Sequence, residues 1–205
     1  MVDATGLMGN GLGQHPGSHH SAPDTTKENI AYINKYQNFD VSTGSAMKAG
    51  TSTPTTYNCH ENHTKDKAEK TTYVSDFSRL PGQTREQFQG TPVYTMDKTT
   101  FSSTSQAWMG DKTKITPKVF SSGTNNTQGE GYGFRILSTS NNGKSIDIYA
   151  HLNPESNVSK DFNELQKSAG KAGVGFDLPQ GTQIGEVGDT GQSSVPHLHI
   201  DKSKP

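Results

Sequence analysis

The segment that most constrains the fold of this chain follows a glycine-rich turn and reads Val-Pro-His-Leu-His-Ile-Asp, at residues 195 to 201. Its histidines alternate with apolar residues, as in a strand with one buried face. The alternation predicts that His197 and His199 share one face while Leu198 and Ile200 point into a core. Two imidazoles on one face can serve a metal ion and its bound water, although two histidines on a solvated strand fit the same pattern.

Two segments upstream alternate in the same way and predict a β-hairpin. Residues 131–137 and 145–152 have the pattern of strands, and Asn-Asn-Gly at residues 141–143 is a strong turn signal between them. His151 falls at the end of the second strand. A further short strand within residues 178–188 leads through a Thr-Gly turn into the histidine strand. Together these segments predict a compact antiparallel sheet.

Four motifs follow one another over residues 123 to 201: Gly-Tyr-Gly, Tyr-Ala-His-Leu, Pro-x-Gly-x-x-Ile-Gly-x-x-Gly-x-Thr-Gly and His-Leu-His. In this order they resemble the zinc endopeptidases of the lysostaphin type, which cleave peptide cross-links of bacterial cell walls. The resemblance implies a mainly β fold, with an antiparallel sheet core of the lysostaphin-like peptidase type carrying long polar inserts. It also implies a zinc ion with His199 as one ligand, and His151 and His197 beside the metal-bound water.

The chemistry of such a site explains why these residue types are needed. A zinc ion with three protein ligands keeps one position open for water and lowers the pKa of that water toward neutrality. Histidines that do not bind the metal can accept the proton of the water and stabilise the tetrahedral oxyanion. The sequence leaves open which of His151 and His197 is the base, and whether either is a structural histidine bonded to the backbone.

The other two zinc ligands are implied by a family motif, His-x-Gly-x-Asp, which does not occur shortly before Tyr-Ala-His-Leu. The segment in register, Leu-Pro-Gly-Gln-Thr at residues 80–84, precedes Gly-Thr-Pro-Val-Tyr as the family motif does, but it carries neither ligand. A second candidate is His-Pro-Gly-Ser-His at residues 15–19, with His19 in place of the aspartate. Histidine is itself a good zinc ligand, so His15, His19 and His199 form a chemically sound set.

Two other groups of metal-type residues stay open as alternatives. His20 and Asp24 form a literal His-x-x-x-Asp pair, one step out of register with the N-terminal candidate. Cys59, His60 and His63 stand close together in a polar and charged stretch that fits no zinc pattern well. Each group also has the composition of a solvated loop, as does the histidine-rich N-terminal arm.

Choosing His15 and His19 as ligands implies a division of the chain into three parts. Residues 1–26 are then an N-terminal segment with the first ligands. Residues 27–118 are a polar insertion of irregular loops and exposed strands, dominated by Ser, Thr, Lys, Asn and Gln. Residues 119–205 are the lysostaphin-like peptidase core.

Composition limits how much core the chain can build. Residues 159–170 predict one short helix with Phe162 and Leu165 on its inner side. Hydrophobic residues make up only 28% of the chain, so we expect a thin core for 205 residues. Long polar segments bury little surface alone, so they either form loops or gain order from neighbours in an assembly.

Charge, cysteine content and hydropathy exclude several classes of function. The net charge is −1 with a pI near 6.7, which favours neither nucleic acid nor an anionic membrane as partner. The single Cys59 excludes an internal disulfide, no apolar run approaches the ~18 residues of a membrane span, and no signal peptide is visible. A wall peptidase of this kind is expected in a virion, in an injection or secretion machine, or at an extracytoplasmic place reached after lysis.

Two functions follow as hypotheses. In the first, the chain is a zinc-dependent endopeptidase that cleaves peptide cross-links of bacterial peptidoglycan as part of a phage virion tail or a secretion machine. In the second, it is a catalytically inactive lysostaphin-like fold that serves as a structural or wall-binding component of an assembly. The first ligand pair discriminates between them: His15 and His19 beside His199 favour the enzyme, whereas Leu80 and Thr84 in that place favour the inactive fold.

Overall fold

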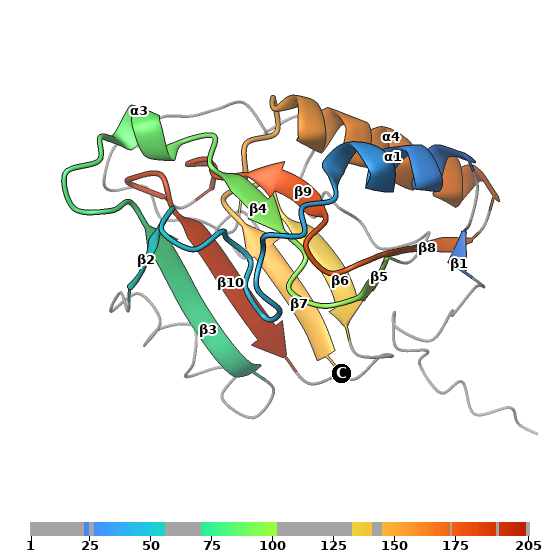
Figure 1. The fold of residues 1–205 in the computed structure, drawn as a ribbon, viewed down its shortest axis with the longest axis horizontal. Helices are drawn as coiled ribbons and strands as arrows, with labels where there is room; N and C mark the ends of the chain where they lie inside the picture. The colour runs from blue at the N-terminus through green and yellow to red at the C-terminus, as the bar shows by residue number, and fades with distance from the viewer. Residues whose placement is uncertain are drawn as a thin grey trace, which may run out of the picture.

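The computed structural model describes residues 23–24, 27–55, 71–101, 133–140, 145–172, 174–191 and 193–203. Its main feature is a large sheet, drawn in Figure 1. In spatial order its strands are β1 (Pro23–Asp24), β8 (Gly175–Leu178), β5 (Thr99–Phe101), β6 (Ile136–Ser140), β7 (Ser145–Ala150), β10 (Leu198–Ser203), β3 (Thr71–Ser78) and β2 (Thr53–Thr55). All neighbours are antiparallel except β1 and β8, so the predicted antiparallel architecture is confirmed. A second sheet consists of β4 (Pro92–Tyr94) and β9 (Gln183–Glu186).

The strands expected around the histidines form the middle of the large sheet. β6 and β7 pair antiparallel with Ile136 opposite Tyr149, which confirms the predicted pair of strands, while their Asn-Asn-Gly turn lies outside the described residues. β10 lies between β7 and β3. Leu198 and Ile200 are fully buried, as the alternation predicts. The histidine strand is therefore held by a partner strand along each of its edges.

The partner on the far edge of β10 comes from the stretch that was expected to hold irregular loops and exposed strands. β3 pairs with β10 so that Asp76 lies opposite His199 and Phe77 opposite Leu198. Threonine, tyrosine, valine and phenylalanine make this segment prone to form a strand despite its polar neighbours. β2 and β5 come from the same stretch. The sheet therefore crosses the boundary predicted between residues 118 and 119.

Two helices lie side by side against the sheets in Figure 1: α1 (Lys27–Tyr36) and α4 (Asn157–Ala172). They are joined by Asp161, whose Oδ2 lies 2.7 Å from Nζ of Lys35 and 2.6 Å from the hydroxyl of Tyr36. α4 contains the predicted helix and confirms it, with Phe162 and Leu165 buried. A single turn, α3 (Arg85–Phe88), and α1 were not predicted, because both belong to the polar stretch, where apolar residues are scattered.

The core between the helices and the sheet is built on aromatic rings. The ring centroid of Phe162 on α4 lies 5.1 Å from that of Phe101 on β5, 5.9 Å from that of Phe176 on β8 and 6.1 Å from that of Tyr32 on α1. Edge-to-face contacts at these distances add to the energy of burial. One side chain therefore ties α4 to α1 and to two strands.

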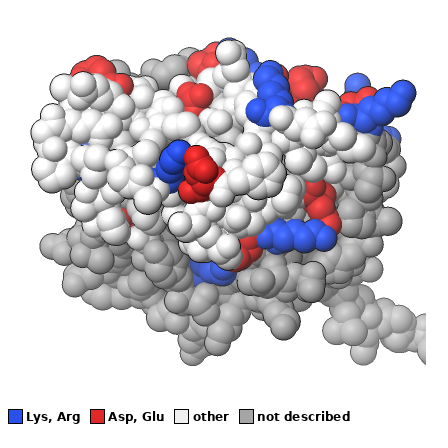
Figure 2. Space-filling view, viewed as in Figure 1, with Lys and Arg blue, Asp and Glu red and all other residues white. Residues whose placement is uncertain are grey.

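The surface is mixed in charge. Figure 2 shows Lys and Arg side chains interspersed with Asp and Glu on one face, with most of the described surface there uncharged. This agrees with the near-zero net charge of the sequence. No helix in the described part of the chain is long and apolar enough to cross a membrane.

The central position of Phe162 leads to a test of the fold. Replacing Phe162 with alanine removes a fully buried ring and leaves a cavity between α4 and the sheet. We expect the free energy of unfolding, measured by urea denaturation, to fall by about 3–5 kcal/mol. Glu164→Ala on the exposed side of the same helix is the control and should stay within about 0.5 kcal/mol of wild type. Equal effects of the two substitutions would contradict this packing.

Candidate active site

Three histidines meet at one end of the sheet, where β7 ends and β10 begins. The ring centroids of His151 and His197 are 4.4 Å apart, and those of His151 and His199 are 5.8 Å apart. His151 and His199 are 5% and 4% exposed, while His197 is half-buried. The structure thus brings the three histidines of the sequence motifs into one largely buried cluster.

The backbone around His151 is tightly constrained. Its φ of 60° lies in the left-handed region, which residues with a side chain seldom adopt. The N–H of Gly188 donates to the carbonyl oxygen of His151 at 3.0 Å, and the N–H of His197 donates to that of Gly188 at 3.3 Å. A Cβ at position 188 would lie 2.8 Å from the carbonyl oxygen of His151 and 2.7 Å from the nitrogen of Asn153. Glycine at this position therefore allows the turn to approach the two histidine strands.

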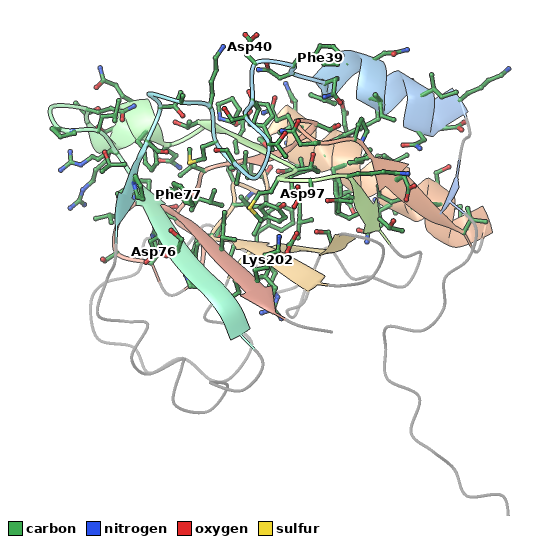
Figure 3. All side chains as sticks on the ribbon, turned by 60° about the horizontal axis from the view of Figure 1, so that its bottom comes forward. Phe39, Asp40, Asp76, Phe77, Asp97 and Lys202 are labelled. Atoms are coloured by element: carbon green, nitrogen blue, oxygen red, sulfur yellow. The ribbon has the colours of Figure 1, made fainter. Side chains whose placement is uncertain are left out.

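His199 lies between two carboxylates. Its Nδ1 is 2.8 Å from Oδ1 of Asp76 on β3, and its Nε2 is 3.3 Å from Oδ1 of Asp201. Asp76 is labelled in Figure 3. Burial lowers the pKa of His199, but the hydrogen bonds to Asp201 and Asp76 outweigh burial and raise the pKa to about 9. Without a bound metal ion, His199 is therefore an imidazolium at neutral pH.

His151 and His197 have their Nδ1 atoms bonded to the backbone. Nδ1 of His151 is 2.7 Å from the carbonyl oxygen of Thr190, and Nδ1 of His197 is 2.9 Å from that of Val195 and 3.0 Å from Oγ of Ser193. A carbonyl oxygen only accepts, so both Nδ1 atoms carry the hydrogen and Nε2 is the acceptor of each neutral ring. Burial, and then the two neighbouring histidines, hold the pKa of His151 well below its ordinary value. Its neutral ring can accept a proton at Nε2.

The residue beside His199 bears on the in-register alternative for the first ligand pair, Leu80 and Thr84. Leu80 and Thr84 follow the end of β3, and Oγ1 of Thr84 caps α3. Neither residue lies beside His199, where Asp76 stands instead. Thr72 precedes Asp76 by four residues in β3, where the motif His-x-Gly-x-Asp has its histidine. The position four residues before Asp76 is therefore held by a threonine and not by a histidine.

Asp76 is the residue that sequence reasoning missed. A search for a histidine four residues before an aspartate passes over it, because Thr72 stands there. The usable signal was Thr-Thr-Tyr-Val-Ser-Asp-Phe-Ser, a segment rich in β-branched and aromatic residues upstream of Gly-Thr-Pro-Val-Tyr at residues 90–94. The single turn α3 lies between these two segments, and the position of Asp76 beside His199 is visible only in the folded chain.

Apart from Asp24, the remaining predicted ligands are not among the described residues. His15 and His19 lie outside the described residues, as do His20, Cys59, His60 and His63. Asp24 belongs to β1, which forms one edge of the large sheet, whereas β10 and β3 lie toward the other. Four strands therefore separate β1 from β10, and the pair of His20 and Asp24 stays a prediction.

The cluster contains two donor types that a zinc ion accepts, an imidazole and a carboxylate. The imidazole of His199 and the carboxylate of Asp76 are donor types that zinc accepts, and Asp201 is placed as a carboxylate that orients a ligating histidine. Two donors do not hold a catalytic zinc. Within the described residues, no group of three or more His, Cys, Asp or Glu can hold a metal ion. Among the described residues this cluster therefore offers two donors of types that zinc accepts, fewer than a catalytic zinc ion requires.

Comparison with known proteins gives only distant likenesses. No family model and no curated protein matches the chain. Among solved structures, the catalytic domain of the antimicrobial peptidase lysostaphin from Staphylococcus simulans is similar at 20% identity and a TM-score of 0.39, over 85% of this chain and 86% of that one. A protein from Pseudomonas aeruginosa assigned to peptidase M23 is similar at 14% identity and a TM-score of 0.39, over 87% of this chain and 58% of that one. The chain thus spans just over half of the second protein, and likeness at this level says nothing about activity.

The environment of His199 predicts how stability depends on pH in the metal-free protein. The pKa of its ring rises on folding from 6.5 to about 9, so its contribution to stability is complete below about pH 6.5 and is lost as the pH rises through about 9. Asp76→Asn keeps the shape of the side chain but removes one carboxylate. We expect the pH-dependent part of the stability to be smaller in this variant and to be lost at lower pH than in wild type, as measured by urea unfolding in EDTA over a pH series.

The control for this experiment is Asp97→Asn. Asp97 pairs with Lys202, 3.5 Å away, and Figure 3 labels both residues. Lys202 lies three positions after His199 along β10, so the two side chains point to opposite faces of the sheet, and this ion pair lies on the face away from His199. The control should keep the pH dependence of wild type. Identical pH profiles for Asp76→Asn and Asp97→Asn would show that Asp76 does not hold the proton on His199.

Proposed function

We propose that this chain is a zinc-dependent endopeptidase that cleaves peptide cross-links of bacterial peptidoglycan. The observation that carries the proposal is the cluster in which His151, His197 and His199 meet Asp76 at one end of the sheet. The ordered sequence motifs support the same function, because the histidines come from two separate motifs of the lysostaphin type.

The residues of the cluster divide into two groups by their hydrogen bonds. His199 and Asp76 would hold the zinc ion, which when bound acts as a Lewis acid and lowers the pKa of a water molecule. Asp201 keeps the ring of His199 in place through Nε2. A ligating nitrogen must be deprotonated, so zinc uptake at His199 releases a proton.

His151 and His197 form the second group and act on protons. Each ring donates from Nδ1 to a backbone carbonyl group, which leaves Nε2 to accept a hydrogen bond from water or to take a proton. The low pKa of His151 keeps its ring neutral, so Nε2 carries no hydrogen before the reaction. Because His197 is the more exposed of the two, it is the ring that an approaching peptide meets first.

The third zinc donor in this proposal comes from outside the described residues. His15 and His19 stay the first candidates, and His60 and His63 are the next. A peptide of the bacterial wall suits a protein with a net charge of −1 and a surface of mixed charge. We place the protein in a virion tail or another injection or secretion assembly, acting in the cell wall or periplasm.

Two observations favour a second candidate function, a catalytically inactive fold that serves an assembly as a structural or wall-binding part. Thr72 stands where the ligand motif has histidine, and threonine is not a common zinc ligand. The side chains of Asp76 and His199 are also only 1% and 5% exposed. An ion pair buried to this degree can hold β3 to β10 without any metal.

Zinc content and Thr72→His together separate the two functions. If the protein is an active peptidase, the wild type binds about one zinc ion per chain by elemental mass spectrometry, and His199→Ala and Asp76→Ala abolish the binding. If the site has decayed, the wild type binds none, and Thr72→His restores binding by returning the histidine four residues before Asp76. His15→Ala and His19→Ala test the N-terminal candidates in the same assay.

Activity is measured as the release of soluble peptide from purified peptidoglycan. We expect His151→Ala and His197→Ala to keep the zinc ion and to lower the rate by about 10²- to 10⁴-fold, the usual effect of removing a general acid or base. Asp97→Asn is the matched control with unchanged rate. A wild-type protein that binds zinc but releases no peptide from any wall preparation would contradict the proposal.

A further inference from the structure

Thr190 lies at the junction of the segments that meet around His151. Its Oγ1 accepts a hydrogen bond from the N–H of Phe134 at 2.9 Å and donates to the carbonyl oxygen of Leu152 at 2.9 Å. Its own carbonyl oxygen is the atom that Nδ1 of His151 approaches to 2.7 Å. The N–H of Leu152 in turn donates to the carbonyl oxygen of Phe134 at 2.9 Å. All four residues are buried, so these bonds form without competition from solvent.

We propose that Thr190 is a positioning residue for His151. Its carbonyl group selects the tautomer of the ring with hydrogen on Nδ1, and its hydroxyl group keeps that carbonyl within reach of the ring. The catalytic meaning of this selection rests on the proposed function, whereas the selection itself is a property of the fold.

The tautomer follows from the contact between the ring and the carbonyl group. The carbonyl oxygen of Thr190 has no hydrogen to give, so the bond exists only when Nδ1 of His151 carries one. The hydrogen bond made by one ring nitrogen decides which nitrogen stays bare. Nε2 of His151 is then the acceptor. The centroid of this ring lies 4.4 Å from that of His197. A proton acceptor is therefore fixed at one defined atom of the cluster.

The hydroxyl group of Thr190 has a role that its carbonyl group cannot fill. A hydroxyl group has one hydrogen to donate and can also accept. The hydroxyl group of Thr190 donates to the carbonyl oxygen of Leu152 and accepts from the N–H of Phe134. Leu152 directly follows His151, and the φ of His151 is 60°. The hydroxyl group thus ties Thr190 to the backbone that carries the histidine, and it supports an unusual backbone conformation there.

Gly133 fixes the same carbonyl group from another side. A Cβ at this position would lie 2.3 Å from the carbonyl carbon of Thr190 and 2.5 Å from its oxygen, so no side chain fits there. Its φ of 59° is also one that glycine adopts easily. The segment before β6 therefore lies directly against the peptide group that Nδ1 of His151 contacts. The carbonyl group has little room to turn away from the ring.

The experiment uses the metal-free full chain labelled with ¹⁵N in its histidines. Long-range ¹H–¹⁵N correlation spectra distinguish a ring nitrogen that carries hydrogen from one that does not, and His151→Gln assigns the signal among the eight histidines. Thr190→Val removes the hydroxyl group at nearly constant shape, and Thr190→Ser keeps it. Thr182→Val is the matched control, because Thr182 is also buried and its Oγ1 bonds Gln37 and the carbonyl oxygen of Pro179, each at 2.8 Å.

We expect hydrogen on Nδ1 of His151 in the wild type, in Thr190→Ser and in Thr182→Val, and loss of that Nδ1–H signal in Thr190→Val. The inference is overturned if the wild type carries hydrogen on Nε2, or if folded Thr190→Val keeps the Nδ1 tautomer unchanged. Should Thr190→Val fail to fold, the wild-type tautomer decides. Because no activity enters this measurement, a protein with the expected tautomer and no peptidase activity would refute the proposed function alone.

Discussion

The contact between Nδ1 of His199 and the carboxylate of Asp76 is the interaction on which the site depends. It joins the neighbouring strands β10 and β3. Nδ1 and Oδ1 are 2.8 Å apart, and both side chains are almost fully buried. A charged group is costly to bury without a partner, so each residue requires the other in the absence of a metal ion. The same two groups are the donors that zinc would use. The site can therefore be a stable ion pair or part of a metal centre. The ring of His199 must lose a proton when the first state changes into the second.

The three histidines have different partners, and their protonation differs for that reason. His199 has a carboxylate at each nitrogen and is cationic near neutral pH. His151 and His197 donate to carbonyl oxygens of the turn that precedes β10, so each keeps Nε2 as its acceptor. Gly188 in that turn permits the close approach, and the turn carries Thr190 to the end of β7. One segment of chain thus sets the state of two rings.

The sequence predicted those parts of the fold that follow from alternation and turn signals. The pairing of β6 with β7, the buried face of β10 and the helix around Phe162 were found because apolar residues recur there at the spacing of their elements. β3 was missed because its strand-forming residues stand in a polar stretch, and its pairing is made with a strand more than a hundred residues away. Asp76 was missed with it. Which ring nitrogen carries hydrogen is likewise set by the backbone carbonyl groups that folding brings to each ring.

The most direct test of the central claim is a crystal structure of the protein with zinc, with anomalous diffraction recorded on either side of the zinc absorption edge. We expect an anomalous peak within bonding distance of Nδ1 of His199 and Oδ1 of Asp76, about 2.0–2.2 Å from each, with a third protein donor beside them. A structure in which zinc is absent, or is bound only at residues away from these two while their hydrogen bond stays intact, would contradict it.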